Sequence, residues 1–444
     1  MNFITNYKLE RYILDTKWED IPPQVQERAR GCGIDLMTAL ILGSRGLQFQ
    51  AGSRLAQQLY TDGDVPVVGS DKTYSFLGAT VAMGHASNSF DIDDGHNMIK
   101  GHPGTSFVAG ILAAGLEQNI TYREYLTTLV IAYDVAVRTG LAIQNHYGFL
   151  HSTGTYGAVS TAAGVGRIFG LSKEELNNAL SVADFHAPLT PVMRAVEYPS
   201  MNKDGVPFGA LLGAMAVLET QAGTTGKTYT LELEEYQPLL DTLGQTYEIM
   251  NLYFKPFTCC RWAHQPIQAW LDMKKAEGIS SEDIVKVTVH TFEAASRLSK
   301  IVPHRADEAQ YNIAWPVAAA LVHGDLGYKQ VTEEALEDPA VLNMMQHLEF
   351  TVDPKMDAQF PEKRLAWIEV LLKDGRTLKS LPYAAPGEAS DGVSLESICK
   401  KFLRITSAVI PQQTAQDILT LLQNAETMPI RDVVLQMNAA MQKS

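Results

Sequence analysis

The chain has few cysteines, fewer basic than acidic residues, and no long apolar stretch. Its four cysteines (Cys32, Cys259, Cys260 and Cys399) show neither a metal-binding spacing nor a disulfide framework, which is typical of a reducing compartment. The apolar stretches fall short of a membrane span, and the acidic N-terminal segment lacks the features of a signal or transit peptide. We therefore expect a cytoplasmic protein.

The charge balance limits the partners. Lys and Arg number 36 against 50 Asp and Glu, and the formal charge is −14, which disfavours nucleic acid and anionic membranes as partners. An anionic substrate must therefore be received by a local basic pocket. The length of 444 residues and a hydrophobic fraction of 46% predict a soluble globular protein with two domains.

Residues 22–223 have a mostly helical pattern, with apolar residues recurring at spacings of three and four. Helices are predicted from Pro23 to near Gly43, over 105–116 and over 122–143. After Ser152 a small residue stands at every fourth position, at Gly154, Ala158, Ala162, Gly166 and Gly170. We interpret this segment as a core helix that another helix approaches closely.

The pattern changes after about residue 253. Residues 284–290 and 348–352 are predicted strands, and 366–372 with 376–381 form a predicted hairpin with a type I′ turn at Asp374-Gly375. Residues 395–440 are again helical in pattern. The predicted fold class is mainly α: an all-helical domain formed by both chain ends (1–253 plus 388–444), with an inserted smaller α+β lid domain (254–387).

The segment from Phe90 to Thr105 is the most informative part of the chain, because it concentrates carboxylates and imidazoles just before an apolar helix. Crowded buried charges are costly, so such a cluster favours an acid–base site. Its carboxylates and imidazoles belong to Asp91, Asp93, Asp94, His96 and His102.

Pro103 suits the first position of a helix, which places His102 at or just before a helix N-terminus. The free N–H groups there attract anions and disfavour an imidazolium, so His102 is expected to be neutral and to act as a general base. A histidine that only caps the helix is the structural alternative. On a helix or tight turn Asp91 and Asp94 would share a face and could orient His102; otherwise they belong to an exposed acidic loop.

Three further segments carry candidate groups. His151 precedes a predicted helix, with Ser152 or Thr153 as its cap, and Lys203 precedes the apolar run 206–218. A lysine there is unfavourable with the helix dipole, which indicates either a bound anion or a solvated loop lysine. Arg261 and His264 lie at the presumed domain junction, where Arg261 could bind a carboxylate in bidentate fashion.

Together these segments resemble the MmgE/PrpD family over nearly the whole chain, from Ile21-Pro22-Pro23 through the His102-Pro103-Gly104 segment, His151, Lys203, the stretch 255–264 and Gln310-Tyr311. The resemblance implies a helical domain with an α+β lid, a homodimer, and chemistry without a cofactor on a small di- or tricarboxylate. It also implies a pocket lined by Asp91, His102, His151, Lys203 and His264. The chain departs from the decarboxylase and dehydratase pattern at two positions, because Gly95 replaces a threonine and Trp315 replaces a tyrosine.

These residues predict a lyase in which His102, oriented by Asp91, moves a proton next to a carboxylate. Substrate carboxylates would be held by Lys203, His151 and His264. The substrate would also be bound by Arg261, Asp94, Gly95 and Trp315. Decarboxylation of the cis-aconitate type, dehydration of the 2-methylcitrate type and, as the alternative, epimerisation of a dicarboxylate such as iminodisuccinate share this step. A metal hydrolase that uses Asp91, Asp93, Asp94, His96 and His102 as ligands is a competing interpretation, as is an inactive scaffold.

Overall fold

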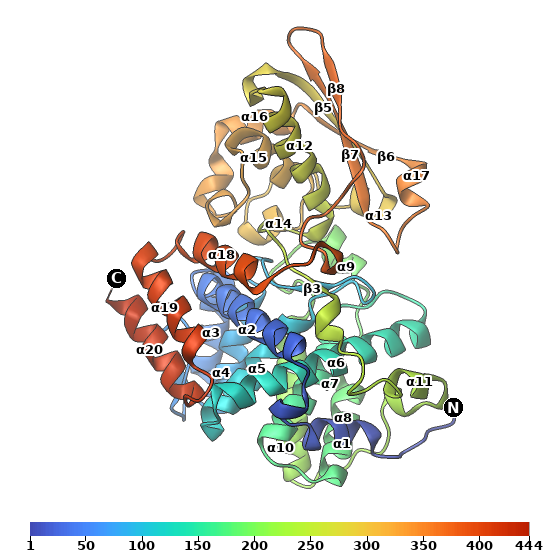
Figure 1. Cartoon of the computed structure of the whole chain (residues 1–444), viewed down its shortest axis with the longest axis vertical. Coiled ribbons are helices and arrows are strands. Elements are labelled where there is room, and N and C mark those ends of the chain that lie inside the picture. Colours follow the sequence, from blue (N-terminus) through green and yellow to red (C-terminus); the bar gives the residue numbers. More distant parts are fainter. Residues whose placement is uncertain (444) are drawn as a thin grey trace.

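The structure is a computed structural model that describes residues 1–443. Most of the chain N-terminal to residue 254 is helical, and these helices form the lower body in Figure 1. Their bounds are α1 Lys8–Asp15, α2 Pro23–Gly43, α3 Leu47–Leu59, α4 Phe76–Ser87, α5 Pro103–Gln118, α6 Tyr122–Tyr147, α7 Thr153–Ile168, α8 Lys173–His186, α9 Met193–Glu197, α10 Val206–Gln221 and α11 Gln237–Leu240. The predicted helices over 23–43, 105–116 and 122–143 are thereby confirmed.

The C-terminal helices α18 (Leu395–Thr406), α19 (Gln412–Asn424) and α20 (Ile430–Gln442) return to the same body, so both chain ends lie there (Figure 1). One hydrophobic cluster contains side chains from 9–254 and from 398–441. α18 packs on α2, and the Lys401 ammonium lies 2.6 Å from the buried Asp35 carboxylate of α2. The C-terminal segment therefore closes the core that the N-terminal segment begins.

Helices α7 and α10 pack at very short range, as the small-residue pattern predicts. A Cβ added at Gly209 would lie 2.5 Å from the Gly154 carbonyl oxygen, and one at Gly213 would lie 2.2 Å from the Ala158 carbonyl oxygen. Only glycine allows this approach, which places the N-terminal ends of α7 and α10 side by side. His151 and Lys203 immediately precede these two ends.

Helix α6 is long and apolar enough to cross a membrane by length and composition alone, which the sequence pattern did not indicate. In the fold, 94% of its most apolar window is buried inside the protein. It packs on α7 and α5, as a core helix does.

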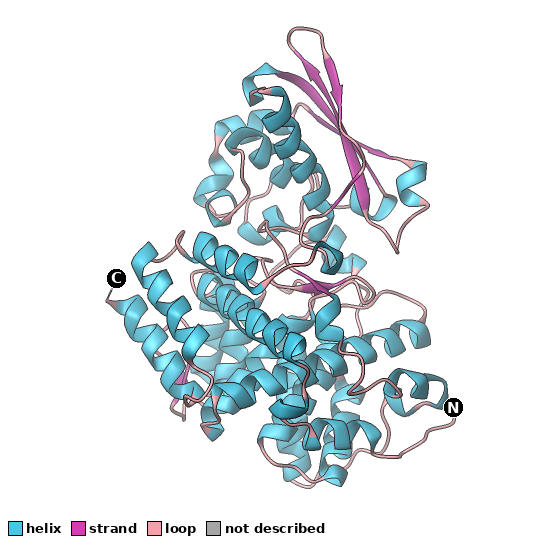
Figure 2. Ribbon diagram, viewed as in Figure 1, coloured by secondary structure: helices cyan, strands magenta, loops and turns pink. Residues whose placement is uncertain are grey.

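The upper part of the molecule holds the main sheet, whose order is β6-β5-β7-β8, with β9 also paired to β7. Its strands are β5 Ile284–Thr291, β6 Leu348–Val352, β7 Leu365–Leu372, β8 Thr377–Lys379 and β9 Tyr383–Ala384. Figure 2 shows these strands along one edge of the upper part, with helices beside them. The helices are α12 His264–Glu277, α13 Glu293–Ser296, α14 Ala306–Gln310, α15 Ala314–His323, α16 Pro339–Met345 and α17 Pro354–Asp357.

Alternate residues of β7 are buried, and β5 shows the same alternation over most of its length. The predicted strands are therefore confirmed, but the turn type of the hairpin is wrong. The loop has three residues, Lys373 to Gly375, and of these only Gly375 has a positive φ, at 86°. A type I′ turn needs two such residues, whereas a three-residue loop needs one glycine at its end.

The chain passes between the two parts twice, and we call these crossings, residues 252–256 and 384–388, the hinge. They are paired, because the Phe254 amide donates to the Gly387 carbonyl at 2.9 Å.

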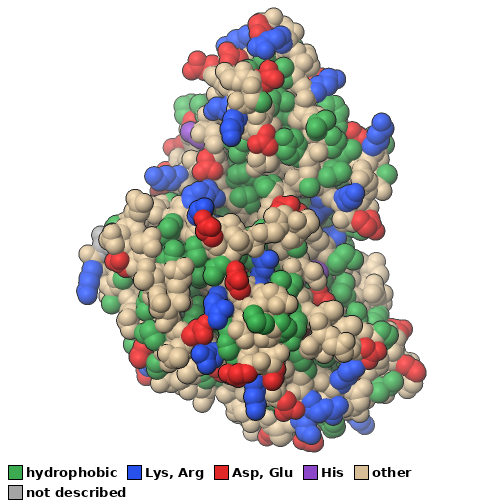
Figure 3. Space-filling model, in the orientation of Figure 1, with side chains coloured by type: hydrophobic (Ala, Val, Ile, Leu, Met, Phe, Trp, Pro, Cys, Tyr) green, Lys and Arg blue, Asp and Glu red, His purple; other side chains and the backbone are tan. Residues whose placement is uncertain are grey.

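A second hydrophobic cluster fills the upper part and includes Phe90 and Ile92 of the lower body. The proposed division into domains at 253/254 and 387/388 stays a prediction. Two short strand pairs complete the fold: β1 Val65–Pro66 with β2 Thr73–Tyr74, and β3 Gly95–His96 with β4 Leu252–Tyr253. Acidic and basic side chains are interspersed on the face in Figure 3.

Candidate active site

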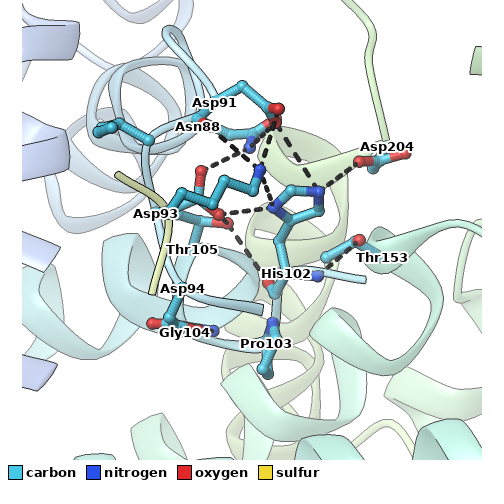
Figure 4. A network of polar contacts seen from close by, with 12 residues as sticks. Asn88, Asp91, Asp93, Asp94, His102, Pro103, Gly104, Thr105, Thr153 and Asp204 are labelled. Carbon is cyan, nitrogen blue, oxygen red and sulfur yellow. Dashed lines mark hydrogen bonds and ion pairs between the residues drawn. The ribbon is translucent and has the colours of Figure 1, made fainter. Parts of the chain in front are cut away.

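His102 is the centre of a buried polar cluster at the start of α5 (Figure 4). It is the N-cap residue and Pro103 the first helical residue, as predicted. Its Nδ1 lies 2.8 Å from Asp93 Oδ2, and Thr105 Oγ1 donates to the same carboxylate oxygen at 3.2 Å. Asn88 Nδ2 donates to the other Asp93 oxygen at 3.0 Å. Asp93, not the predicted Asp91, therefore holds the imidazole in place.

The opposite ring nitrogen of His102 faces two other carboxylates. Nε2 lies 3.4 Å from Asp204 Oδ2 and 3.7 Å from Asp91 Oδ1. The Tyr311 hydroxyl donates to the same Asp204 oxygen at 2.7 Å. Because Asp204 and Tyr311 come from distant parts of the chain, this half of the site assembles only on folding.

Lys255 from the hinge supplies a fully buried positive charge. Its Nζ lies 2.9 Å from Asp91 Oδ2 and 3.4 Å from His102 Nδ1. Burial alone would lower the pKa of Lys255, but Asp91 and Asp93 outweigh burial and raise it. The side chain is therefore an ammonium that balances one of the carboxylates.

The prediction that His102 is neutral is wrong in direction. Burial and the Lys255 ammonium oppose its protonation, but Asp93 and Asp91 outweigh them and raise the pKa of His102. A helix terminus contributes about 0.3–1 kcal/mol, whereas an opposite charge at this range shifts a pKa by about 1–3 units, or about 1.4–4 kcal/mol. Although burial opposes ionisation of Asp93, His102 and Lys255 lower its pKa. At neutral pH the arrangement favours an imidazolium on a carboxylate.

Lys203 and Asp91 have strained backbones, with φ of 40° and 54° in the left-handed region. Lys203 Nζ donates to the Asn88 and Ser89 carbonyls and to Gln310 Oε1, the last at 2.6 Å. Burial lowers the pKa of Lys203, and the nearby carboxylates oppose that effect. Strain at buried polar residues is typical of functional positions.

A cavity of about 370 Å³ adjoins the cluster. Lys203 and Gly205, which flank Asp204, line it together with Ser152. Its other polar groups include the Arg194 guanidinium and the hydroxyls of Thr190, Tyr198 and Ser200, and no carboxylate is among its lining side chains in residues 1–443. The cavity is therefore suited to a small anion.

Asp94 points away from the His102 ring (Figure 4). Tyr133 donates to its Oδ2 at 2.5 Å and the Gly104 amide to its Oδ1 at 3.2 Å, so it caps α5 from below. Burial raises the pKa of Asp94 to about 7. The segment 91–94 is not helical, and the expectation that Asp91 and Asp94 share a face is therefore wrong.

His151 lies at its predicted helix start and His264 is the first residue of α12, but the rings of both form hydrogen bonds with backbone carbonyls. The two His151 nitrogens lie 3.2 and 3.3 Å from the Ser152 and Gly140 carbonyls, and His264 Nε2 lies 3.1 Å from the Cys259 carbonyl. Burial lowers the pKa of both rings, which are therefore neutral. His264 Nδ1 is buried without a hydrogen-bond partner. Their role in holding substrate stays a prediction.

The predicted substrate-binding residues Arg261 and Trp315 have protein partners. Arg261 donates to the Ala385 and Pro386 carbonyls and pairs with Glu388 at 2.8 Å, so it ties the turn before α12 to the hinge. The Trp315 indole is fully buried and donates to the Gln330 carbonyl at 2.9 Å. Contact of either with substrate stays a prediction.

Gly95 permits a close approach of the hinge. A Cβ at this position would lie 2.3 Å from the hydroxyl of Tyr253, its partner in the β3–β4 pair. The Tyr253 ring also lies under the Arg261 guanidinium, 4.4 Å away. The glycine is therefore required by packing, whatever its role toward substrate.

Sequence reasoning gave no catalytic role to Asp93, Asp204, Lys255 or Tyr311. Asp93 was considered only as a metal ligand, although it stands in the same acidic segment as Asp91. Asp204 adjoins Lys203, and Lys255 and Tyr311 lie in stretches that carried the family resemblance. Its position next to Lys203, already a candidate, was the sequence signal that could have identified Asp204.

The competing metal interpretation has a geometric basis, because Asp91, Asp93 and His102 offer ligand atoms within 4.8 Å of one another. The Lys255 ammonium, however, already contacts both Asp91 and His102. A divalent ion there would have to displace or deprotonate a lysine whose pKa is raised. The arrangement favours proton transfer over metal binding.

The chain is similar to known proteins over nearly its whole length. The chain matches the models of the MmgE/PrpD N-terminal domain over residues 7–243 and C-terminal domain over residues 257–427. It is 22% identical to a cis-aconitate decarboxylase-like protein of Aspergillus oryzae over 95% of this chain and 94% of the relative. It is 24% identical to the mitochondrial 2-methylcitrate dehydratase of Yarrowia lipolytica (94% and 85%) and 20% identical to the cis-aconitate decarboxylase of Aspergillus terreus (90% and 89%). These relatives are named as lyases, and the chain belongs to the MmgE/PrpD family.

Proposed function

We propose that this protein is a lyase of the decarboxylase type, which protonates a small unsaturated di- or tricarboxylate such as cis-aconitate as carbon dioxide leaves. The observation that carries the proposal is the His102 ring, held at 2.8 Å by Asp93 and facing Asp204 with its other nitrogen. Asp93 and Asp91 raise the pKa of this ring, which favours the protonated form and hence a proton donor in the resting site.

In the proposed reaction, Lys203 and Arg194 hold two substrate carboxylates from the adjoining cavity. The carbon–carbon bond to the third carboxylate, which is allylic, breaks and releases carbon dioxide. Its electron pair forms the new double bond, and the electrons of the old double bond take the Nε2 proton of His102 at the far alkene carbon. Asp93 stays ionised and stabilises the ring before transfer, and solvent protons restore the imidazolium.

The acidic surroundings support decarboxylation over the related reactions. Asp91 and Asp204 lie beside Nε2, where their negative charge disfavours a nearby substrate carboxylate and favours its departure as neutral carbon dioxide. Dehydration and epimerisation begin with removal of a proton, which needs a neutral imidazole. The raised pKa of His102 works against that first step.

The test is turnover of cis-aconitate, 2-methylcitrate, citrate and iminodisuccinate by wild type, His102→Gln and Lys203→Ala. We expect conversion of cis-aconitate with release of carbon dioxide, abolished in His102→Gln with anion binding retained. Lys203→Ala should weaken binding, and more so for substrates of higher charge. Asp94→Asn is the matched control, because Asp94 faces α5. Epimerised iminodisuccinate with untouched cis-aconitate would replace this proposal by the epimerase.

We also propose that two copies associate around the cavity mouth. Phe185, Tyr198 and Phe208 are 85%, 75% and 50% exposed, and Tyr198 lines the cavity. Exposed aromatic residues beside a site favour an interface. Light scattering of wild type against Phe185→Ser/Phe208→Ser tests this: a dimer that becomes a monomer supports it, and a wild-type monomer contradicts it.

A further inference from the structure

A second cavity, of about 320 Å³, lies at the hinge. Both crossings line it, through Phe254 and Pro256 on one side and Pro386 on the other. The third wall is α18, which lies at the top of the lower body directly below the upper part (Figure 1). The cavity therefore touches both crossings of the hinge and one helix of the lower body.

The cavity has apolar walls and a basic rim. Phe254, Pro256 and Ile398 supply apolar surface, and Lys400 and Arg404 stand one turn apart on α18. No acidic residue lines it in the described part of the chain, which is notable in a chain of charge −14. Apolar surface beside paired cations fits an anion with an apolar body.

The two basic groups can exchange partners. Lys400 pairs with Glu396 at 2.7 Å and Arg404 with Asp325 at 3.4 Å, and these carboxylates are 75% and 52% exposed. Exposed ion pairs contribute little free energy, so a carboxylate ligand can compete with them.

The cavity and the acid–base site share one residue. Lys255 is among the residues that line the cavity, while its Nζ lies 2.9 Å from Asp91 and 3.4 Å from His102. A ligand in the cavity is therefore adjacent to a residue whose ammonium contacts the imidazole. The shared lysine provides a physical connection between the hinge and the chemistry.

We propose that the hinge cavity is a binding site for a small aliphatic carboxylate, with its chain against Phe254 and Ile398 and its head between Lys400 and Arg404, and that its occupancy is transmitted to His102 through Lys255. Binding does not depend on the proposed reaction. Val393 and Ile398 also line a neighbouring cavity of about 190 Å³, into which a longer chain can extend. Each added methylene should tighten binding about fourfold, the equivalent of about 0.8 kcal/mol.

Calorimetry with the full chain tests the site, using butanoate, hexanoate and octanoate below their micelle concentrations, with octanol and octylammonium for comparison. We expect affinity to rise along the carboxylate series and to be at least tenfold weaker for the alcohol and the amine. Ser397→Trp, which fills the cavity from the exposed side of α18, and Lys400→Gln/Arg404→Gln should abolish octanoate binding. Arg431→Gln, a basic residue on α20, is the control. Equal binding of octanol, or octanoate binding that survives Ser397→Trp, would overturn the site.

The connection to His102 has a readout that needs no substrate. NMR of labelled histidine, with the His102 signal assigned by His102→Gln, gives the midpoint of its titration. An added negative charge at the hinge stabilises the imidazolium, so octanoate should raise this midpoint in wild type and not in Ser397→Trp. Octanoate that binds and leaves the midpoint unchanged would overturn the connection while the site stands, whether or not the lyase proposal holds.

Discussion

Replacing Asp93 with asparagine should make His102 a weaker base. Asparagine keeps an oxygen within reach of Nδ1 but removes the charge that lies 2.8 Å away, in a site where both side chains are buried. An opposite charge at this distance shifts a pKa by about 1–3 units, so the pKa of His102 should fall by that amount. Once the pKa of His102 lies below the assay pH, each further unit by which it falls lowers the protonated fraction of the ring tenfold. At a pH above both midpoints the variant should keep about 0.1–10% of wild-type kcat/KM.

NMR titration of labelled histidine measures the shift without substrate, and kcat/KM against pH measures its consequence. Wild-type activity should decline as pH rises through a pKa above 6.5, because the protonated ring is the active form. In Asp93→Asn the decline should move to lower pH. A decline caused by titration of a substrate carboxyl group would instead stay at the same pH in both proteins. Asp94→Asn is matched in chemistry and position, and should leave the midpoint nearly unchanged. Equal effects of the two variants, or activity that increases with pH, would refute the acid assignment.

The remaining predictions concern the groups around the ring. Because burial raises the pKa of Asp94 from 3.8 to about 7, the fold holds a proton that the unfolded chain releases, and this contribution to stability falls as pH rises from about 4 to 7. Asp94→Asn should remove about 3 kcal/mol of that fall between pH 5 and 8, measured by urea unfolding at the two pH values; parallel wild-type and variant curves would contradict it. Lys255→Met should cost about 3–5 kcal/mol, because it leaves Asp91 buried without its cation, and Lys255→Met/Asp91→Asn should recover part of that loss. Gly95→Thr should cost about 1–3 kcal/mol by collision with Tyr253, and Tyr253→Ala should relieve it; a stable single variant would show that the ring can move.

Periodic segments were predictable from the sequence because their burial is periodic. The strands at 284–291 and 348–352 and the helix from Pro23 to Gly43 lie where apolar spacing placed them. The hairpin turn was not predictable to the same degree, because Asp-Gly also ends a three-residue loop, and only the φ values of the loop distinguish the two types. Helix starts were informative as well, since Pro103 alone located His102 at an N-cap.

The partners of His102 depended on tertiary structure. The left-handed φ of Asp91 breaks the helical pattern on which its pairing with Asp94 was predicted, and Asp93 reaches the ring instead. Lys255 and Asp204 arrive from segments more than 100 residues away, which spacing within a motif cannot indicate. The protonation state followed from these partners, so the local argument from the helix dipole gave the wrong direction for the pKa.

Proton donation by His102 is tested most directly by proton NMR of purified protein with cis-aconitate in D2O, with and without EDTA, for wild type and His102→Gln. We expect a decarboxylated product that carries one deuterium at the former alkene carbon, formed equally with EDTA and absent from His102→Gln. Product formation that persists in His102→Gln, or that EDTA abolishes and a divalent metal restores, would contradict proton donation by His102 as the central step.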